Sequence, residues 1–254
     1  MDLLDRLICK LLVEQPQYRN TTIPDNEYEK KQLFRSLVNV RPALAIDDDF
    51  LYMQDNYLQH EIAEKGIIDI CELEEIQPKL YLWRGDITRL KVDAIVNAAN
   101  SGMIGCFVPC HACIDNAIHT YAGVQLRLEC EKIMQEQAYP ETTGGAKITS
   151  AYNLPSRYIL HTVGPIIKIE PTKSQCEELA ACYRSCFELA DNYRLSSISY
   201  CCISTGEFRF PNQQAAEIAI QTIKACMQSA KSIDRVVFNV YKKEDYNIYA
   251  DLLG

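Results

Sequence analysis

Long apolar runs are absent from this sequence of 254 residues, and no stretch approaches the ~20 apolar residues that a membrane-spanning helix needs. The first residues also lack the pattern of a secretory signal peptide. No internal repeat or low-complexity segment occurs. We therefore expect a globular, cytoplasmic protein that does not act at a membrane.

Positive charge is also scarce, because the formal net charge is −8 at pH 7. Nucleic-acid binding proteins release counterions through a basic stripe, and this sequence has none. We therefore expect no nucleic-acid partner, although a local basic pocket is compatible with this charge. The chain is long enough for one large α/β domain, or a domain with an extension, to bury its core without covalent staples.

Twelve cysteines would suit a disulfide framework only in a small secreted chain. Here most of them lie inside apolar strand or helix patterns. Cys182 and Cys186 are spaced i, i+4, and Cys201 and Cys202 lie in an apolar strand pattern. This placement predicts reduced thiols.

Residues 1–75 are predicted to be all helical. Apolar residues repeat with helical spacing in three segments, which end at Pro16, Pro42 and Gly66. Reactive side chains do not cluster there, so we expect a helical extension that covers one edge of the following domain. It could also complete the rim of a pocket or dock a substrate.

Residues 76–254 are predicted to form a three-layer α/β/α domain, because strand patterns alternate with helices of ten or more residues. The predicted strands cover residues 80–83, 94–96, 147–151, 158–161, 197–203 and 235–241. The predicted helices begin near residues 114, 125, 176, 213 and 244.

Polar residues follow the predicted strands, where side chains of an open sheet share one crevice. They are Asp86, Asn97 with Asn100, His161 with Gly164, and residues 204–208. A carboxylate can accept the exocyclic amine of a base, and carboxamides can bridge ribose hydroxyls. The turn at 204–208 can direct N–H groups at phosphates without net positive charge. Together these residues predict a nucleotide site.

The loop after the second strand contains Cys106, Cys110, His111 and Cys113 within eight residues. These are zinc ligands by type. The C-x-x-C spacing of Cys110 and Cys113 also permits a thiol–disulfide pair, and packing is the third interpretation. By contrast, we expect His119 on the following helix to be buried for packing or orientation, and His161 to be structural.

Several ordered motifs make the chain recognisable, namely VNAANS, AIHTYAG, GGAKIT with NLP, HTVGP, and ISTGEF before a proline. From about residue 80 to its end the chain resembles the macrodomain family of ADP-ribose binders and ADP-ribosyl hydrolases. The resemblance implies a mixed central sheet and an ADP-ribose cleft.

The resemblance also implies roles for residues in that cleft. Asp86, beside Ile87, would accept the adenine amine, and Tyr241 would stack on the adenine ring. Asn97 and Asn100 would contact the distal ribose. The diphosphate would be held by the loop that comprises Ser204, Thr205, Gly206, Glu207 and Phe208, with Phe208 near the distal ribose.

The loop at 105–113 departs from the family, because a typical macrodomain has a glycine run there. Glycines permit close backbone approach, whereas cysteine and histidine ligate metal. The pattern resembles the zinc-dependent branch, which also has an N-terminal helical extension. That branch implies one Zn²⁺ held by Cys106, His111 and Cys113, with a fourth position open. Cys110 is then an extra thiol, or the fourth ligand of a closed site.

We therefore predict a zinc-dependent hydrolase that removes mono-ADP-ribose from protein side chains, through the ester of an Asp or Glu as the resemblance implies. Asn100 would fix the ribose, and Asp115 and Glu207 are candidate proton handlers. Asp115 lies near a helix start, where it could cap the helix or orient the site. The alternatives are a non-catalytic reader and a deacetylase of O-acetyl-ADP-ribose. The resemblance further implies a sirtuin-type ADP-ribosyl transferase and a lipoyl carrier protein as partners.

Overall fold

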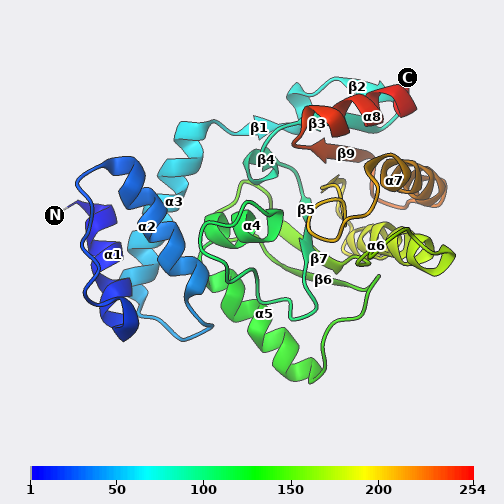
Figure 1. Ribbon diagram of the computed structural model, residues 1–254. Coiled ribbons are helices and arrows are strands. Elements are labelled where there is room, and N and C mark those ends of the chain that lie inside the picture. The colour runs from blue at the N-terminus through cyan, green and yellow to red at the C-terminus, as the bar shows by residue number, and fades with distance from the viewer. Residues whose placement is uncertain (1) are drawn as a thin grey trace.

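A seven-stranded sheet, in the order β2-β3-β9-β8-β5-β7-β6, runs through the computed structural model, which describes residues 2–254 (Figure 1). The central strands are parallel, and β2 and β6 join the two edges antiparallel. The strands are β2 (Glu75–Gln77), β3 (Leu80–Arg84), β5 (Ala94–Ala99), β6 (Ala146–Ser150), β7 (Tyr158–Val163), β8 (Ser197–Tyr200) and β9 (Arg235–Val240). The predicted α/β fold with a mixed sheet is thus confirmed.

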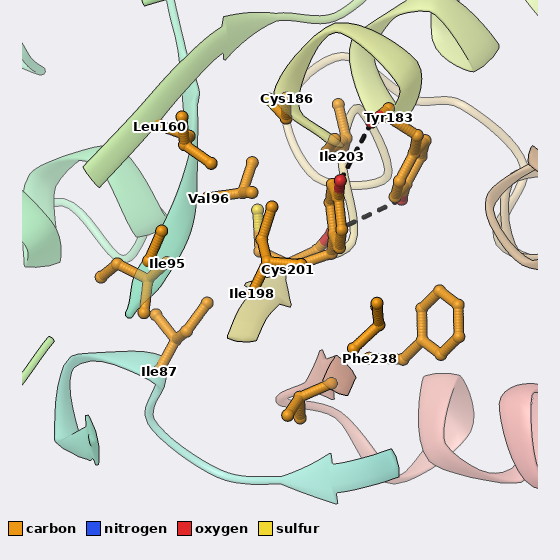
Figure 2. Packing of buried hydrophobic residues seen from close by; sticks show 14 of the residues in the cluster. Ile87, Ile95, Val96, Leu160, Tyr183, Cys186, Ile198, Cys201, Ile203 and Phe238 are labelled. Carbon is orange, nitrogen blue, oxygen red and sulfur yellow. Dashed lines mark hydrogen bonds between the residues drawn. The ribbon is translucent and has the colours of Figure 1, made fainter. Parts of the chain in front are cut away.

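Helices cover both faces of this sheet (Figure 1). One layer consists of α4 (Ile114–Ala122) and α5 (Val124–Gln137), and the other of α6 (Lys173–Asn192), α7 (Asn212–Met227) and α8 (Lys243–Leu253). Because β5 is covered on both sides, Ala94, Ile95 and Val96 are completely buried, which explains their uninterrupted apolar run. Figure 2 shows part of this core, with Ile95 and Val96 of β5 on one side and Tyr183 on the other. The hydroxyl of the buried Tyr200 donates to the carbonyl of Tyr183 at 3.0 Å.

The N-terminal helices α1 (Leu3–Glu14), α2 (Glu27–Val40) and α3 (Asp48–Lys65) form most of a second apolar core, which also includes Val124 of α5. They pack beside α4 and α5, whereas the edges of the sheet are occupied by β2 and β6 (Figure 1). The longest described helix, α6, is amphipathic, and among residues 2–254 no helix combines the length and apolar character of a membrane span.

The prediction that residues 1–75 are all helical is wrong for their last part. Gly66, at φ 80°, ends α3, and its carbonyl accepts from Arg89 Nε at 2.7 Å. The chain beyond is extended, because β1 (Ile68–Asp69) pairs with β4 (Leu90–Lys91) and β2 begins at Glu75. Short 3₁₀ turns complete the chain, η1 (Pro16–Tyr18), η2 (Ile70–Glu72) and η3 (Ile87–Arg89).

The neighbouring strands β5 and β8 determine where a ligand can bind. From β5 the chain continues to β6 and β7 on one side, and from β8 it continues to β9 on the other. Such a switch point leaves a crevice at the carboxyl ends of the two strands, where open α/β sheets bind ligands. The loops that border this crevice are residues 100–113 and 201–211.

Candidate functional site

Cys106, His111 and Cys113 come together in the loop between β5 and α4. Their ligand atoms lie within 4.8 Å of one another, and all three side chains are half-buried. Cys106 Sγ and His111 Nδ1 are 3.6 Å apart. A tetrahedral zinc with Zn–S near ~2.3 Å and Zn–N near ~2.0 Å would hold such atoms about 3.5 Å apart. The donor set and its spacing therefore fit zinc.

Cys113 lies where the loop meets α4. It forms the N-cap of α4, and its Sγ accepts from the backbone N–H of Asn116 at 3.4 Å. Burial, together with the nearby Cys106 thiol and Asp115, raises the pKa of Cys113 to about 12. The side chain is therefore a neutral thiol at pH 7 unless a bound cation removes its proton.

Cys110 is turned away from this group and toward α2. Its backbone has φ 50°, its Sγ lies 3.2 Å from Ser36 Oγ, and its thiol donates to the carbonyl of Gln32 at 3.4 Å. Cys110 does not belong to the group of close ligand atoms formed by Cys106, His111 and Cys113. The geometry therefore favours three ligands over a closed site with Cys110.

Asn97 lies behind the site. It is completely buried, and its Nδ2 donates to Asp115 Oδ1 at 2.8 Å and lies 3.1 Å from His161 Nδ1. This differs from the expectation that Asn97 faces the ribose. His161 also differs, because it lies inside β7 and not after it. Both side chains therefore support the residues that line the crevice.

Asp115 connects this buried layer to the exposed Asn100. Its Oδ2 accepts from Asn100 Nδ2 at 3.4 Å, and Asn100 Oδ1 accepts from the N–H of Gly102 at 2.9 Å. Cys113 caps α4, so the Asp115 carboxylate orients Asn97 and Asn100 instead. Burial raises the pKa of Asp115 to about 6, and the hydrogen bond from Asn97 opposes that rise.

The loop after β8 forms the opposite wall of the crevice. Ser204, at φ 65°, starts a turn in which its carbonyl accepts from Phe210 N at 2.9 Å. Gly206 is exposed, and a Cβ there would meet no atom within 4 Å, so the protein itself leaves room beside its backbone. Glu207 Oε1 lies 3.6 Å from His111 Nε2. This contact joins the predicted phosphate loop to the predicted metal loop.

The remaining predicted residues are distributed around the same end of the sheet. The half-buried Asp86 accepts from Thr88 N at 3.0 Å and from Thr88 Oγ1 at 2.6 Å. Tyr241 is 78% exposed directly after β9, which pairs with the strand that precedes Asp86. The buried Ile87 lies in η3. In the opposite loop, Thr205 Oγ1 donates to the carbonyl of Cys202 at 3.1 Å, and the carbonyl of the half-buried Phe208 accepts from Ile167 N at 2.8 Å.

A second group of metal-ligand types, His119, Cys130 and His161, lies in the core. His161 Nε2 faces Thr149 Oγ1 at 2.9 Å, and its Nδ1 faces Asn97, so neither ring nitrogen is free. Burial raises the pKa of Cys130 far above its ordinary value, which keeps the thiol neutral. The prediction that His119 is buried is confirmed, and His161 is buried inside β7.

Residues on α2 and α5 hold the loop that contains Cys106, His111 and Cys113. The sequence motifs did not indicate these residues. Arg35 on α2 donates to the carbonyl of His111 at 2.9 Å, and Asn39 accepts from the N–H of Cys110 at 2.9 Å. Arg127 on α5 donates to the carbonyl of Ile104 at 2.8 Å. No periodicity or spacing rule relates positions so far apart in sequence.

Comparison with known proteins agrees with this geometry. The Macro domain family model matches residues 96–219. A protein-ADP-ribose hydrolase from Treponema medium is 54% identical over 252 residues, which are 98% of this chain and 97% of that protein. A variant of the Oceanobacillus iheyensis macrodomain with ADPR is 38% identical with a TM-score of 0.64, and the match covers 71% of this chain and 95% of that one. A Trypanosoma brucei macrodomain in complex with ADP-ribose is 28% identical with a TM-score of 0.68, covering 87% and 95%.

Proposed function

Because the chain belongs to the Macro domain family, we propose that it is a zinc-dependent hydrolase that removes mono-ADP-ribose from modified protein side chains. The hydrolase half is supported by the relative named a protein-ADP-ribose hydrolase, which matches almost the whole chain. The zinc half depends on one observation, the grouping of Cys106, His111 and Cys113 at the switch-point crevice. The bond cleaved is proposed to be the ester of an Asp or Glu, as the resemblance implies.

Cys106, His111 and Cys113 would hold the zinc ion. Three protein ligands leave a fourth position for water or substrate, as in catalytic zinc sites. Bound there, zinc would supply Lewis-acid polarisation of a carbonyl or activation of a water. Glu207 would accept from His111 Nε2–H, which leaves Nδ1 on the side of Cys106 and fixes the orientation of the ring.

Asn100 would position the distal ribose beside these ligands. Its carboxamide is exposed at the crevice, yet contacts with Gly102, Gly105 and Asp115 restrict its rotation. Fixing the substrate in this way converts binding energy into proximity. Asp115 is only 4% exposed, so it would act by orienting Asn100.

The nucleotide half of the substrate would lie between the other two walls. Asp86 would accept the adenine amine, and the exposed ring of Tyr241 would stack on the base. The loop Ser204–Phe208 would donate backbone N–H groups to the diphosphate. Neutral donors of this kind suit a protein whose net charge is −8.

The decisive experiment measures ADP-ribose released from an automodified, mono-ADP-ribosylated protein. We expect release by the wild-type protein, and a loss of at least about 100-fold after chelation or in Cys113→Ala, because a Lewis acid lowers a barrier by several kcal/mol. Both samples should still bind free ADP-ribose. Treating the substrate with hydroxylamine, which cleaves esters, should remove the same modification that the enzyme removes.

Three outcomes would contradict parts of this proposal. Stoichiometric binding of the modified protein without release would make this protein a reader. If a folded, zinc-free Cys113→Ala protein released ADP-ribose as fast as wild type, zinc would have no role in the reaction. If the enzyme released ADP-ribose from a linkage that hydroxylamine does not cleave, that linkage would not be an ester. The sirtuin-type transferase and the lipoyl carrier protein stay predictions from the resemblance.

A further inference from the structure

The helix α2 of the N-terminal extension presents a polar stripe to the loop that contains the three proposed zinc ligands. Gln32, Arg35, Ser36 and Asn39 follow the i, i+3, i+4, i+7 spacing of one helix face. All four have contacts with this loop, and three of them meet Cys110. Cys110 therefore attaches the loop to α2, which explains why its thiol is turned away from the other two.

Arg35 lies at the centre of this contact. Its Nη2 donates to the carbonyl of His111 at 2.9 Å, and its Nε and Nη2 donate to Asn116 Oδ1 at 3.1 and 2.7 Å. Asn116 is completely buried, its Nδ2 donates to the carbonyl of Val108 at 2.9 Å, and its backbone N–H donates to Cys113 Sγ. One guanidinium thus restrains the loop at two of the three ligands.

Arg127 connects the first ligand to the same helix. Its Nη2 donates to the carbonyl of Cys106 at 3.4 Å, and its Nη1 donates to the carbonyls of Val38, Asn39 and Arg41 at the end of α2. All three ligands are therefore held, directly or through one residue, by contacts that involve α2.

We propose that α2 is part of the metal site, with Arg35 as a positioning residue that holds the loop in the shape that binds zinc. The loop has no helix or strand between Ala99 and Ile114, so side chains from elsewhere must fix its backbone. Partners outside the ligand shell commonly determine ligand orientation. This inference depends on the proposed zinc function, and it assigns the extension a role beyond covering the domain.

The test is the zinc affinity of full-length variants, measured by competition with a chromophoric chelator. Arg35→Met should bind zinc about 10- to 100-fold more weakly than wild type, the usual effect of removing a second-shell partner. Arg35→Lys, which keeps the charge, should lie between them. Lys31→Met is the matched control, because Lys31 on α2 pairs with Glu61 at 2.7 Å and Glu27 at 3.0 Å, and within residues 2–254 it forms no ion pair with the loop. Its affinity should equal that of wild type.

Cobalt supplies a second readout that packing alone would not change. The absorption bands of a cobalt–thiolate site should shift or weaken in Arg35→Met and match wild type in Lys31→Met. Equal affinity and spectra in wild type and Arg35→Met would overturn the inference while leaving the zinc proposal intact. Equal losses in both methionine variants would also overturn it. A wild-type protein that binds no zinc would overturn the proposed metal site itself, and if Arg35→Met does not fold, Arg35→Lys decides the question.

Discussion

The two groups of cysteine and histidine in this protein have the same kinds of ligand but different surroundings. In each group the ligand atoms lie within 4.8 Å of one another. The first, Cys106, His111 and Cys113, lies half-buried in an irregular loop at the crevice. The second, His119, Cys130 and His161, is completely enclosed by the core. Proximity of ligand types therefore does not distinguish a metal site from packing.

One difference lies in the contacts that His161 and His111 already make. His161 has partners on both ring nitrogens, so a metal would have to displace either the bond to Asn97 or the bond to Thr149. Losing buried hydrogen bonds costs about 1–3 kcal/mol each. His111 instead directs Nδ1 at Cys106 and Nε2 at Glu207, the arrangement of a ligand with an outer partner. The bonds of His161 therefore favour packing, whereas the half-buried His111 keeps a ring nitrogen beside Cys106.

The largest predicted effect is in the first group. Cys106→Ala should reduce zinc affinity by at least about 100-fold, because two remaining ligands cannot compete with water for a four-coordinate ion. Metal analysis after gel filtration should find about one zinc per wild-type chain and almost none in the variant. Circular dichroism should show that both proteins are folded. If the variant kept its zinc, residues other than this group would have to bind the metal.

Acidification should test the second group. Burial lowers the pKa of His161 from 6.5 to about 3, so below pH 6.5 the unfolded chain binds a proton that the folded protein does not. The free energy of unfolding therefore decreases as the pH is lowered. His161 contributes up to about 1.4 kcal/mol to this decrease for each pH unit. We would measure the free energy of unfolding in urea between pH 7 and ~4. Its dependence on pH should be shallower by that amount in His161→Gln than in wild type.

The comparison with His161→Gln is needed because other groups titrate in the same range. His119, whose pKa is also lowered by burial, adds a slope of the same sign. Asp115, whose pKa is raised to about 6, adds a slope of the opposite sign between its unfolded and folded values. Both are common to the two proteins. Parallel slopes would therefore contradict a neutral, buried His161.

Removing the thiol of the second group should affect stability alone. Cys130 is 2% exposed, so Cys130→Ala leaves a small cavity that should cost about 1–2 kcal/mol of unfolding free energy. Zinc content and ADP-ribose release should equal those of wild type, as measured by metal analysis and a turnover assay. Loss of zinc from a folded Cys130→Ala protein would show that the distinction between the groups is wrong.

The smallest predicted effect concerns the contact between the two loops. The Glu207 side chain is 74% exposed, so Glu207→Ala should weaken zinc binding by only about two- to fivefold, the range of an exposed ion pair. Glu207→Gln, which keeps an acceptor for His111 Nε2–H, should recover most of that loss in the same chelator competition. A glutamine variant as weak as the alanine variant would assign the effect to charge.

Much of the fold was predictable because its signals are local. The apolar run at Ala94–Val96 indicated a strand, and helical periodicity predicted α1, α2 and α3. The two-stranded pairing of β1 with β4 was not predictable, because each strand has only two residues and its partner lies about twenty residues away. Nothing in so short a segment distinguishes a strand from a loop.

The candidate site also has a part that was predictable from the sequence and a part that was not. Cys106, His111 and Cys113 could be selected because ligands at close spacing in one loop form a pattern. Asn97 was expected to face the ribose, and sequence order alone could not reveal that Asp115 and His161 enclose it. Alternation along a strand assigns a side chain to a face. It does not say what covers that face.

By itself, the sequence determined the order of strands and helices, the polar residues that end the strands, and the supply of soft ligands in one loop. Each is a property of neighbours along the chain, where spacing and residue type act directly. Only the tertiary structure decided which ligand types are accessible, where Cys110 points, and that Arg35 and Asn39 hold a loop more than sixty residues away. Those outcomes depend on burial and hydrogen-bond partners, which arise when distant segments pack together.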